Sequence, residues 1–182
     1  SEAMLNRKNS KGIMLKDEID RIGGDTKNID KSSNQFENVL ACFELHIEQG
    51  TTLENKGIDI GVVESMPNIS RHKILIKGQA GHSGTTLMEN RKDALVVASK
   101  LIIFINKLAK EISQKDNRHF VATVGRIEVS PNYVTIIPSD VEFIIDLRVV
   151  NETSRNLFFN QLNKEIIKLK KLENLKINFH DL

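Results

Sequence analysis

The spacing of apolar positions from about residue 69 onward predicts an alternating series of strands and helices. Apolar residues that alternate with polar ones indicate strands with one buried face, whereas a three-to-four-residue spacing indicates amphipathic helices. The expected elements are strand Arg71–Lys77, helix Asn90–Ile112, strand Phe120–Val129, a strand within Val134–Val150, helix Thr153–Leu172 and strand Leu175–Phe179. This order predicts a ferredoxin-like βαββαβ domain over residues 69–182, an α+β fold with an antiparallel sheet and both helices on one face.

Each expected helix carries a continuous apolar stripe, and Asn90 is expected to cap the first one. The stripe residues are Ala94, Ala98, Leu101, Ile105, Leu108 and Ile112 in the first helix and Phe158, Leu162, Ile166 and Leu169 in the second. Val96, Val97, Ile103 and Phe104 widen the apolar surface of the first helix beyond its stripe. A helix that is apolar on more than one side usually has a partner, which predicts a homodimer formed through these helices or through a sheet edge.

Residues 1–68 follow a different pattern. They predict a short helix at Met14–Ile22, a buried strand at Val39–Ile47 and a second strand at Ile58–Ser65. Met66-Pro67-Asn68 resembles a hinge, because proline cannot continue a central strand. These elements are too few to enclose a core, so residues 1–68 are expected to be an incomplete slice of a larger domain and not to be self-sufficient.

Composition narrows the classes of partner. The chain has 182 residues, with 26 Lys+Arg against 24 Asp+Glu, no Trp and one Tyr. Nucleic acid is disfavoured as a partner, since phosphate binding needs clustered cations and base stacking needs aromatic side chains. A membrane span is also disfavoured, because no apolar run approaches the ~20 residues required. The single Cys42 excludes an internal disulfide and suits a reducing, cytoplasmic location; it is expected to be a small buried side chain.

Three residues stand in patterns that suit chemistry. His46 lies between Glu44 and Glu48, where it is either a metal ligand oriented by a carboxylate or a core histidine bonded to a carbonyl group.

His82 lies in the small-residue loop Gly78–Thr86, which is either an ordinary connection or a place where a histidine donates to an oxyanion. Arg148 follows Asp146 on the same strand face, where it either clamps a ligand carboxylate or forms a structural pair with Asp146. His72, His119 and His180 are expected to be surface residues.

Three motifs, in order, resemble one family. Glu44-Leu45-His46-Ile47-Glu48-Gln49-Gly50 with Leu53-Glu54 is similar to the ELHIEQGxxLE motif, and Gly81–Leu95 is similar to GHAGTTPMxxRxDAL. The later Val124-Gly125-Arg126-Ile127, Pro131-Asn132, Ile137-Pro138 and Asp146-Leu147-Arg148 follow its VGxI…PNxxNVIP…DxR pattern. The chain thus resembles, over nearly all its length, the N-carbamoyl-L-amino-acid amidohydrolase, allantoate amidohydrolase and β-ureidopropionase group of the M20 metallopeptidase clan.

The resemblance implies roles for individual residues. His46 matches a ligand of one of two divalent metals, and His82 matches a histidine that reaches across the dimer and helps to hold the polarised carbonyl of the substrate. Arg148 matches the arginine that binds the substrate carboxylate, and Gln49 matches a residue near the substrate. Thr135 stands where the family has a substrate-contacting asparagine, and Leu87 replaces a proline.

The same resemblance implies that the whole enzyme hydrolyses a linear amide or ureido substrate bearing a carboxylate, with a pair of metals of the Zn, Mn, Co or Ni class. The resemblance also implies that residues 1–68 are an incomplete slice of an α/β catalytic domain and that residues 69–182 are the lid and dimerisation domain. The other metal ligands of the family and its general base have no counterpart in this sequence. We therefore expect the isolated chain to bind no metal and to be inactive. The alternative is a ferredoxin-like dimerisation or binding module without catalysis, whereas an RNA binder lacks the necessary stacking aromatics.

Overall fold

The computed structural model describes residues 2–34, 39–116 and 118–182, apart from the side chains of residues 2 and 32–34. The chain divides into two compact units, Ser1–Gly61 and Val62–Leu182.

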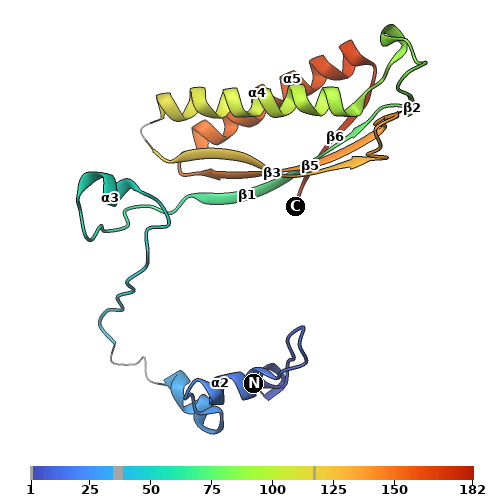
Figure 1. Cartoon of the computed structure of the whole chain (residues 1–182). Helices are drawn as coiled ribbons and strands as arrows, with labels where there is room; N and C mark the ends of the chain where they lie inside the picture. Colours follow the sequence, from blue (N-terminus) through green and yellow to red (C-terminus); the bar gives the residue numbers. More distant parts are fainter. Residues whose placement is uncertain (1, 35–38, 117) are drawn as a thin grey trace. The chain divides into compact units, whose positions relative to one another are not determined.

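The second unit is a four-stranded antiparallel sheet with two long helices on one face (Figure 1). Its main elements are β1 (Asn68–Lys77), α4 (Ala94–Lys115), β3 (Phe120–Ser130), β5 (Asp140–Val149), α5 (Glu152–Glu173) and β6 (Lys176–Asp181). The strand order β3-β5-β1-β6 is that of a ferredoxin-like fold, so the predicted fold class is confirmed. Two short insertions join these elements: η2 (Met88–Asn90) and a small ladder of β2 (Gly81–His82) with β4 (Ile136–Ile137).

The sheet core follows from strict alternation in the two central strands. Ile74 and Ile76 of β1 lie opposite Phe143 and Val141 of β5, and all four side chains are buried under the helices. The alternate positions of the same strands lie on the face that neither helix covers (Figure 1), and most of them are polar, apart from Ile69, Leu75 and Ile144. The period-two pattern of the sequence therefore sorts the sheet into a core face and an open face, as predicted.

Strand β3 changes face part-way along its length. The pairing of β3 with β5 shifts between Val124 and Arg126, so Gly125 is an extra residue in a β-bulge. Before the bulge Phe120 faces the core; after it Ile127 occupies the corresponding position opposite Phe143. The bulge thereby places Arg126 and Glu128 on the open face of the sheet. An unbroken alternation from Phe120 would have placed both on the core face, so the sequence pattern did not predict this change.

The helical stripes also form as expected. All ten predicted stripe residues of α4 and α5 are buried, and they pack against the core face of the sheet. Val96 and Ile103 are exposed, as the widened apolar surface requires, and Phe104 is half-buried. Val97 is 1% exposed, so its expected place on the outer surface is wrong: it belongs to the core cluster.

Helix α4 begins four residues later than predicted. Its cap is Asp93, whose carboxylate accepts hydrogen bonds from the backbone N–H groups of Leu95 (2.9 Å) and Val96 (3.2 Å). Asn90 ends the short helix η2 instead. Lys92, just before α4, pairs with Gln79 in an isolated β-bridge, in which the Gln79 N–H donates to the carbonyl oxygen of Lys92. Because Lys92 is held in this bridge, the helix begins only after it.

Replacing Asp93 by alanine is expected to lower the free energy of unfolding by about 1 kcal/mol, because two backbone donors at the start of α4 lose their acceptor. Urea unfolding followed by far-ultraviolet circular dichroism measures the change. Asn90→Ala is the matched control and should be close to neutral, since Asn90 does not cap α4. Equal losses for both variants would contradict the assignment of the cap.

The first unit contains short helices and extended chain. Its helices are α1 (Glu2–Leu5), α2 (Leu15–Arg21), η1 (Thr26–Asn34) and α3 (Thr52–Lys56). Helix α2 confirms the helix expected at Met14–Ile22, and Gly23 follows it with a left-handed φ of 89°.

The two strands expected in this part of the chain do not form. Val39–Ile47 and Ile58–Ser65 are assigned to no strand, and their apolar side chains are exposed, with Leu40 and Phe43 almost fully so. Cys42 is exposed as well, so its predicted burial is also wrong. A strand covered on both faces needs neighbouring strands and covering helices, and the described residues pair with neither segment.

Candidate functional site

One end of the sheet gathers two of the predicted site residues. His82 of β2 lies opposite Ile136 of β4, and the N–H of Ser83 donates to the carbonyl oxygen of Thr135 at 2.9 Å. A two-residue ladder therefore holds the His82 loop against the segment that contains Thr135. This ladder was not predictable from the sequence, because two residues are too few to show a periodicity.

The imidazole of His82 is fixed by its own loop. The backbone N–H of Gly84 donates to Nδ1 of His82 at 3.1 Å. Because Nδ1 is the acceptor in this hydrogen bond, the neutral ring carries its proton on Nε2. The His82 side chain is exposed, so Nε2–H is available to donate to a ligand oxygen.

Arg91 stabilises the same loop through two hydrogen bonds to its backbone. Its Nη2 donates to the carbonyl of Ser83 at 2.6 Å and its Nε donates to the carbonyl of Thr86 at 3.0 Å. Gly81 lies close to this turn, where an added Cβ would be 2.9 Å from Oγ1 of Thr86. Arg91 was not singled out from the sequence, although it stands within the second motif.

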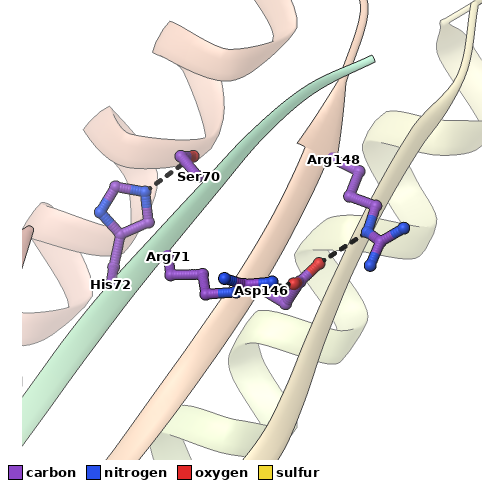
Figure 2. Close-up of polar contacts among 5 residues, drawn as sticks. All are labelled: Ser70, Arg71, His72, Asp146 and Arg148. Atoms are coloured by element: carbon purple, nitrogen blue, oxygen red, sulfur yellow. Dashed lines mark hydrogen bonds and ion pairs between the residues drawn. The ribbon is translucent and has the colours of Figure 1, made fainter. Parts of the chain in front are cut away.

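The open face of the sheet carries the third predicted residue, Arg148. Its Nε donates to Oδ1 of Asp146 at 2.9 Å, while Nε of Arg71 on β1 contacts Oδ2 of the same carboxylate at 3.4 Å. Figure 2 shows Asp146 between the two guanidinium groups, with His72 and Ser70 on the other side of β1. The structural pair with Asp146 is present, and it engages only the Nε edge of Arg148 within the described part of the chain.

The two arginines keep Asp146 ionised. The hydrogen bond from Arg148, and then its charge, lower the pKa of the Asp146 carboxyl below its ordinary value, with smaller effects from Arg71. Two guanidinium groups and one carboxylate leave one net positive charge here. This charge favours an anionic ligand.

His82 and Arg148 do not meet within one chain. His82 lies beside the start of β5, since the neighbouring Ile137 is joined to β5 through Pro138 and Ser139, whereas Arg148 lies at the other end of that strand (Figure 1). Arg148 is eight residue steps along β5 from Asp140, which corresponds to about 26 Å. One ligand of amino-acid size does not reach both.

The remaining predicted residues belong to the first unit. His46 is exposed, and its Nδ1 lies 2.6 Å from the carbonyl oxygen of Ile47. Gln49 adopts a left-handed φ of 58°. Glu48 accepts hydrogen bonds from the N–H groups of Thr52 (2.8 Å) and Leu53 (2.9 Å) at the start of α3, and these bonds lower the pKa of its carboxyl.

The side chain of His46 is arranged as one metal ligand would be. A carbonyl partner at Nδ1 leaves Nε2 for a metal, which is the usual arrangement of a ligating histidine. No group of three or more His, Cys, Asp or Glu side chains suited to a metal ion occurs within residues 2–34, 39–116 and 118–182. These residues therefore do not fit a metal pair by themselves, and a pair would need ligands in addition to His46.

His72 is buried, and its expected surface position is wrong. It is 3% exposed, with Nδ1 2.7 Å from Oδ1 of Asp181 and Nε2 2.9 Å from Oγ of Ser70. Its ring also packs on Phe159 and Phe179, with centroids 4.6 Å and 5.2 Å away. His72 lies two and four residues before the buried Ile74 and Ile76 in β1, so it shares their face of the strand. This spacing was the signal for its burial. His119 and His180 are exposed, as predicted.

Comparison with known proteins places this geometry in a family. The M20 peptidase dimerisation domain matches residues 65–173, which contain the His82 loop, both long helices and strands β1, β3 and β5 of the sheet. The chain belongs to the M20 peptidase dimerisation-domain family. The fold of the second unit and the second and third motifs agree with this membership.

Relatives of the M20 chain include named amidohydrolases. It is 32% identical over 152 residues to N-carbamoyl-L-amino-acid amidohydrolase of Paenarthrobacter aurescens, covering 84% of this chain and 36% of that protein. It is 38% identical over 110 residues to allantoate amidohydrolase of Bacillus subtilis, covering 60% and 26%.

A hydantoinase/carbamoylase family amidase of known structure, from Burkholderia ambifaria, is 25% identical and has a TM-score of 0.77; the match covers 100% of this chain and 42% of that one. The chain thus spans well under half of the relatives it matches. Among the helices of the described residues, none combines the length and apolar character needed to span a membrane.

Proposed function

We propose that the chain is the lid and dimerisation part, residues 69–182, with a catalytic-domain segment, residues 1–68, of a longer amidohydrolase. The substrate is a small linear amide or ureido compound with a carboxylate, of the N-carbamoyl amino acid or allantoate type. The names of the relatives support this reaction class. The positive charge at Arg148 and the exposed Nε2–H of His82 supply the two polar contacts that such a substrate needs.

In this proposal each residue has a distinct role. Arg148 binds the substrate carboxylate through its Nη atoms, and His82 donates from Nε2 to the carbonyl oxygen as negative charge develops there. Gln49 and Thr135 lie near the substrate. His46 is one ligand of a divalent metal pair whose other ligands come from outside the described residues; when bound, the metals polarise the carbonyl and activate water.

The observation that carries the proposal is the placement of His82 and Arg148 at opposite ends of β5. In a two-fold homodimer, His82 of one protomer can serve the site that contains Arg148 of its partner. The surface expected to form the dimer is β3, which is an edge strand of the sheet, together with the exposed Ile103 of α4. A cytoplasmic location, consistent with the single Cys42, is part of the same proposal.

Mixing two inactive variants of the longer protein tests this arrangement. His82→Ala and Arg148→Gln are purified separately, unfolded and refolded together, and hydrolysis of an N-carbamoyl amino acid is measured. Random pairing makes half of the dimers mixed, and each mixed dimer has one intact site of two, so we expect about a quarter of the wild-type rate.

The matched control mixes His82→Ala with a His82→Ala, Arg148→Gln double variant, which contains no complete site in any pairing. No recovery in the first mixture, with dimers present by light scattering, would refute a shared site. Absence of hydrolysis by the wild-type longer protein itself would favour the alternative, a dimerisation or binding module without catalysis, which the exposed Val96 and Ile103 of α4 support.

A further inference from the structure

The guanidinium groups of Arg71 and Arg148 share one carboxylate, and among the residues that the structure describes most of their N–H donors have no other partner. Arg71 and Asp146 are cross-strand partners in β1 and β5, and Arg148 lies two residues further along β5 on the same face. Each arginine contacts a different oxygen of Asp146, and each does so through Nε. A guanidinium has five N–H groups, so the four on its Nη atoms remain for a ligand in each case.

The exposure of the three side chains places these donors toward solvent. The side chains of Arg71 and Arg148 are 61% and 48% exposed, whereas that of Asp146 is 28% exposed. The Asp146 carboxylate is therefore closer to the sheet surface than the two guanidinium groups that it orients. Because Asp146 compensates only one of the two positive charges, the pair still attracts an anion.

Two apolar residues on the open face flank Arg148. Ile69 of β1 and Val121 of β3 are the cross-strand partners of Arg148 on either side, and both are partly exposed. Thr123 is the partner of Asp146 on β3. An aliphatic ligand body can lie against Ile69 and Val121 while its charged groups meet the arginines, and these apolar neighbours reduce the hydration that weakens exposed ion pairs.

We propose that Arg71 is a second anion-binding residue, so that Arg71 and Arg148 together bind a ligand with two carboxylates joined by a short aliphatic chain. Each guanidinium fork matches one carboxylate, which is the geometry that arginine favours over lysine. Combined with the proposed amidohydrolase function, on which this step rests, the substrate class is N-carbamoyl amino acids with an acidic side chain.

Dicarboxylate binding to the 182-residue chain tests the proposal directly. Succinate and acetate are titrated at constant ionic strength, and the Nε–H signals of the arginine side chains are followed by ¹H–¹⁵N NMR. We expect acetate to shift the Arg148 signal, and succinate to shift both signals and to bind about tenfold more tightly, as a second charged contact of this size predicts.

Three variants separate the contributions. Arg71→Gln should reduce succinate affinity about tenfold, to the level of acetate, and leave acetate binding unchanged. Arg148→Gln should weaken both ligands. Arg126→Gln is the matched control, because Arg126 is an exposed arginine of the open face that pairs with Glu128 of its own strand; it should change neither affinity.

The outcomes distinguish this proposal from the proposed function. If succinate binds no more tightly than acetate, or if Arg71→Gln weakens both ligands equally, Arg71 is only a structural partner of Asp146 and the proposal is overturned. In that case the carboxylate role of Arg148 stands. If neither ligand shifts the Arg148 signal, both the dicarboxylate site and the proposed carboxylate role of Arg148 fail. Arg71→Lys, which keeps the charge but lacks the fork, should lose most of the succinate preference.

Discussion

Replacing His82 by alanine is expected to lower kcat of the longer amidohydrolase about 10²–10³-fold, the usual cost of removing one donor to a developing oxyanion. The physical reason is the fixed ring: Gly84 N–H occupies Nδ1, so the donor is Nε2–H. Because this contact strengthens as the carbonyl oxygen gains charge, the loss should fall mainly on kcat rather than on KM. Steady-state hydrolysis of an N-carbamoyl amino acid measures both constants.

The matched control for this variant is His119→Ala, which removes an exposed histidine that lies before β3. It should leave kcat within about twofold of the wild-type value, since an exposed surface substitution has little effect. A His82→Ala variant that keeps full kcat, or that raises KM alone, would show that His82 contributes only to binding or to the loop.

Replacing Phe143 by alanine is expected to reduce the free energy of unfolding by about 3–5 kcal/mol, which is the range for a large aromatic side chain removed from a core. Phe143 is fully buried at the centre of β5, between the sheet and the helices. The loss has two parts: the free energy gained by burying the ring is no longer available, and a cavity remains where the ring was. Urea unfolding of the 182-residue chain, followed by far-ultraviolet circular dichroism, measures this change.

Ile127→Ala provides the comparison, because Ile127 lies directly opposite Phe143 on β3 and is 45% exposed. Its loss should be about 1 kcal/mol or less, in proportion to the smaller area it buries. If the two variants lost similar free energies, the core would not be centred on β5 and the distinction between the core face and the outer edge of the sheet would be wrong.

The second unit was predictable because its segments bury one face each. The alternation around Phe143 and the stripe through Leu101 identify their elements without reference to the rest of the chain. The bulge at Gly125 was not predictable, since one extra residue changes the face of the following side chains without leaving a pattern. The start of α4 also depended on a distant contact, the hydrogen bond from Ala94 to the carbonyl of Pro138.

The first unit shows the opposite case. The continuous apolar run Val39–Ile47 predicted a strand covered on both faces, but such a strand exists only when other segments pair with it and cover it. The motif predicts a metal-ligand role for His46, and this role stays a prediction, because the described residues bring no group of further ligands together. Arg148 is likewise a candidate from its motif alone, whereas its relation to Arg71 could not be predicted, because it depends on the register of β1 against β5.

The uncovered run that includes Leu40, Phe43, Leu45 and Ile47 has a consequence for the chain in solution. An extended apolar segment with unpaired backbone groups is a template for intermolecular β-pairing, so concentrated samples of these 182 residues should aggregate through it. Chaperones and proteases recognise the same kind of segment. In the longer protein that we propose, covering this run would therefore protect newly made chains from precipitation and degradation.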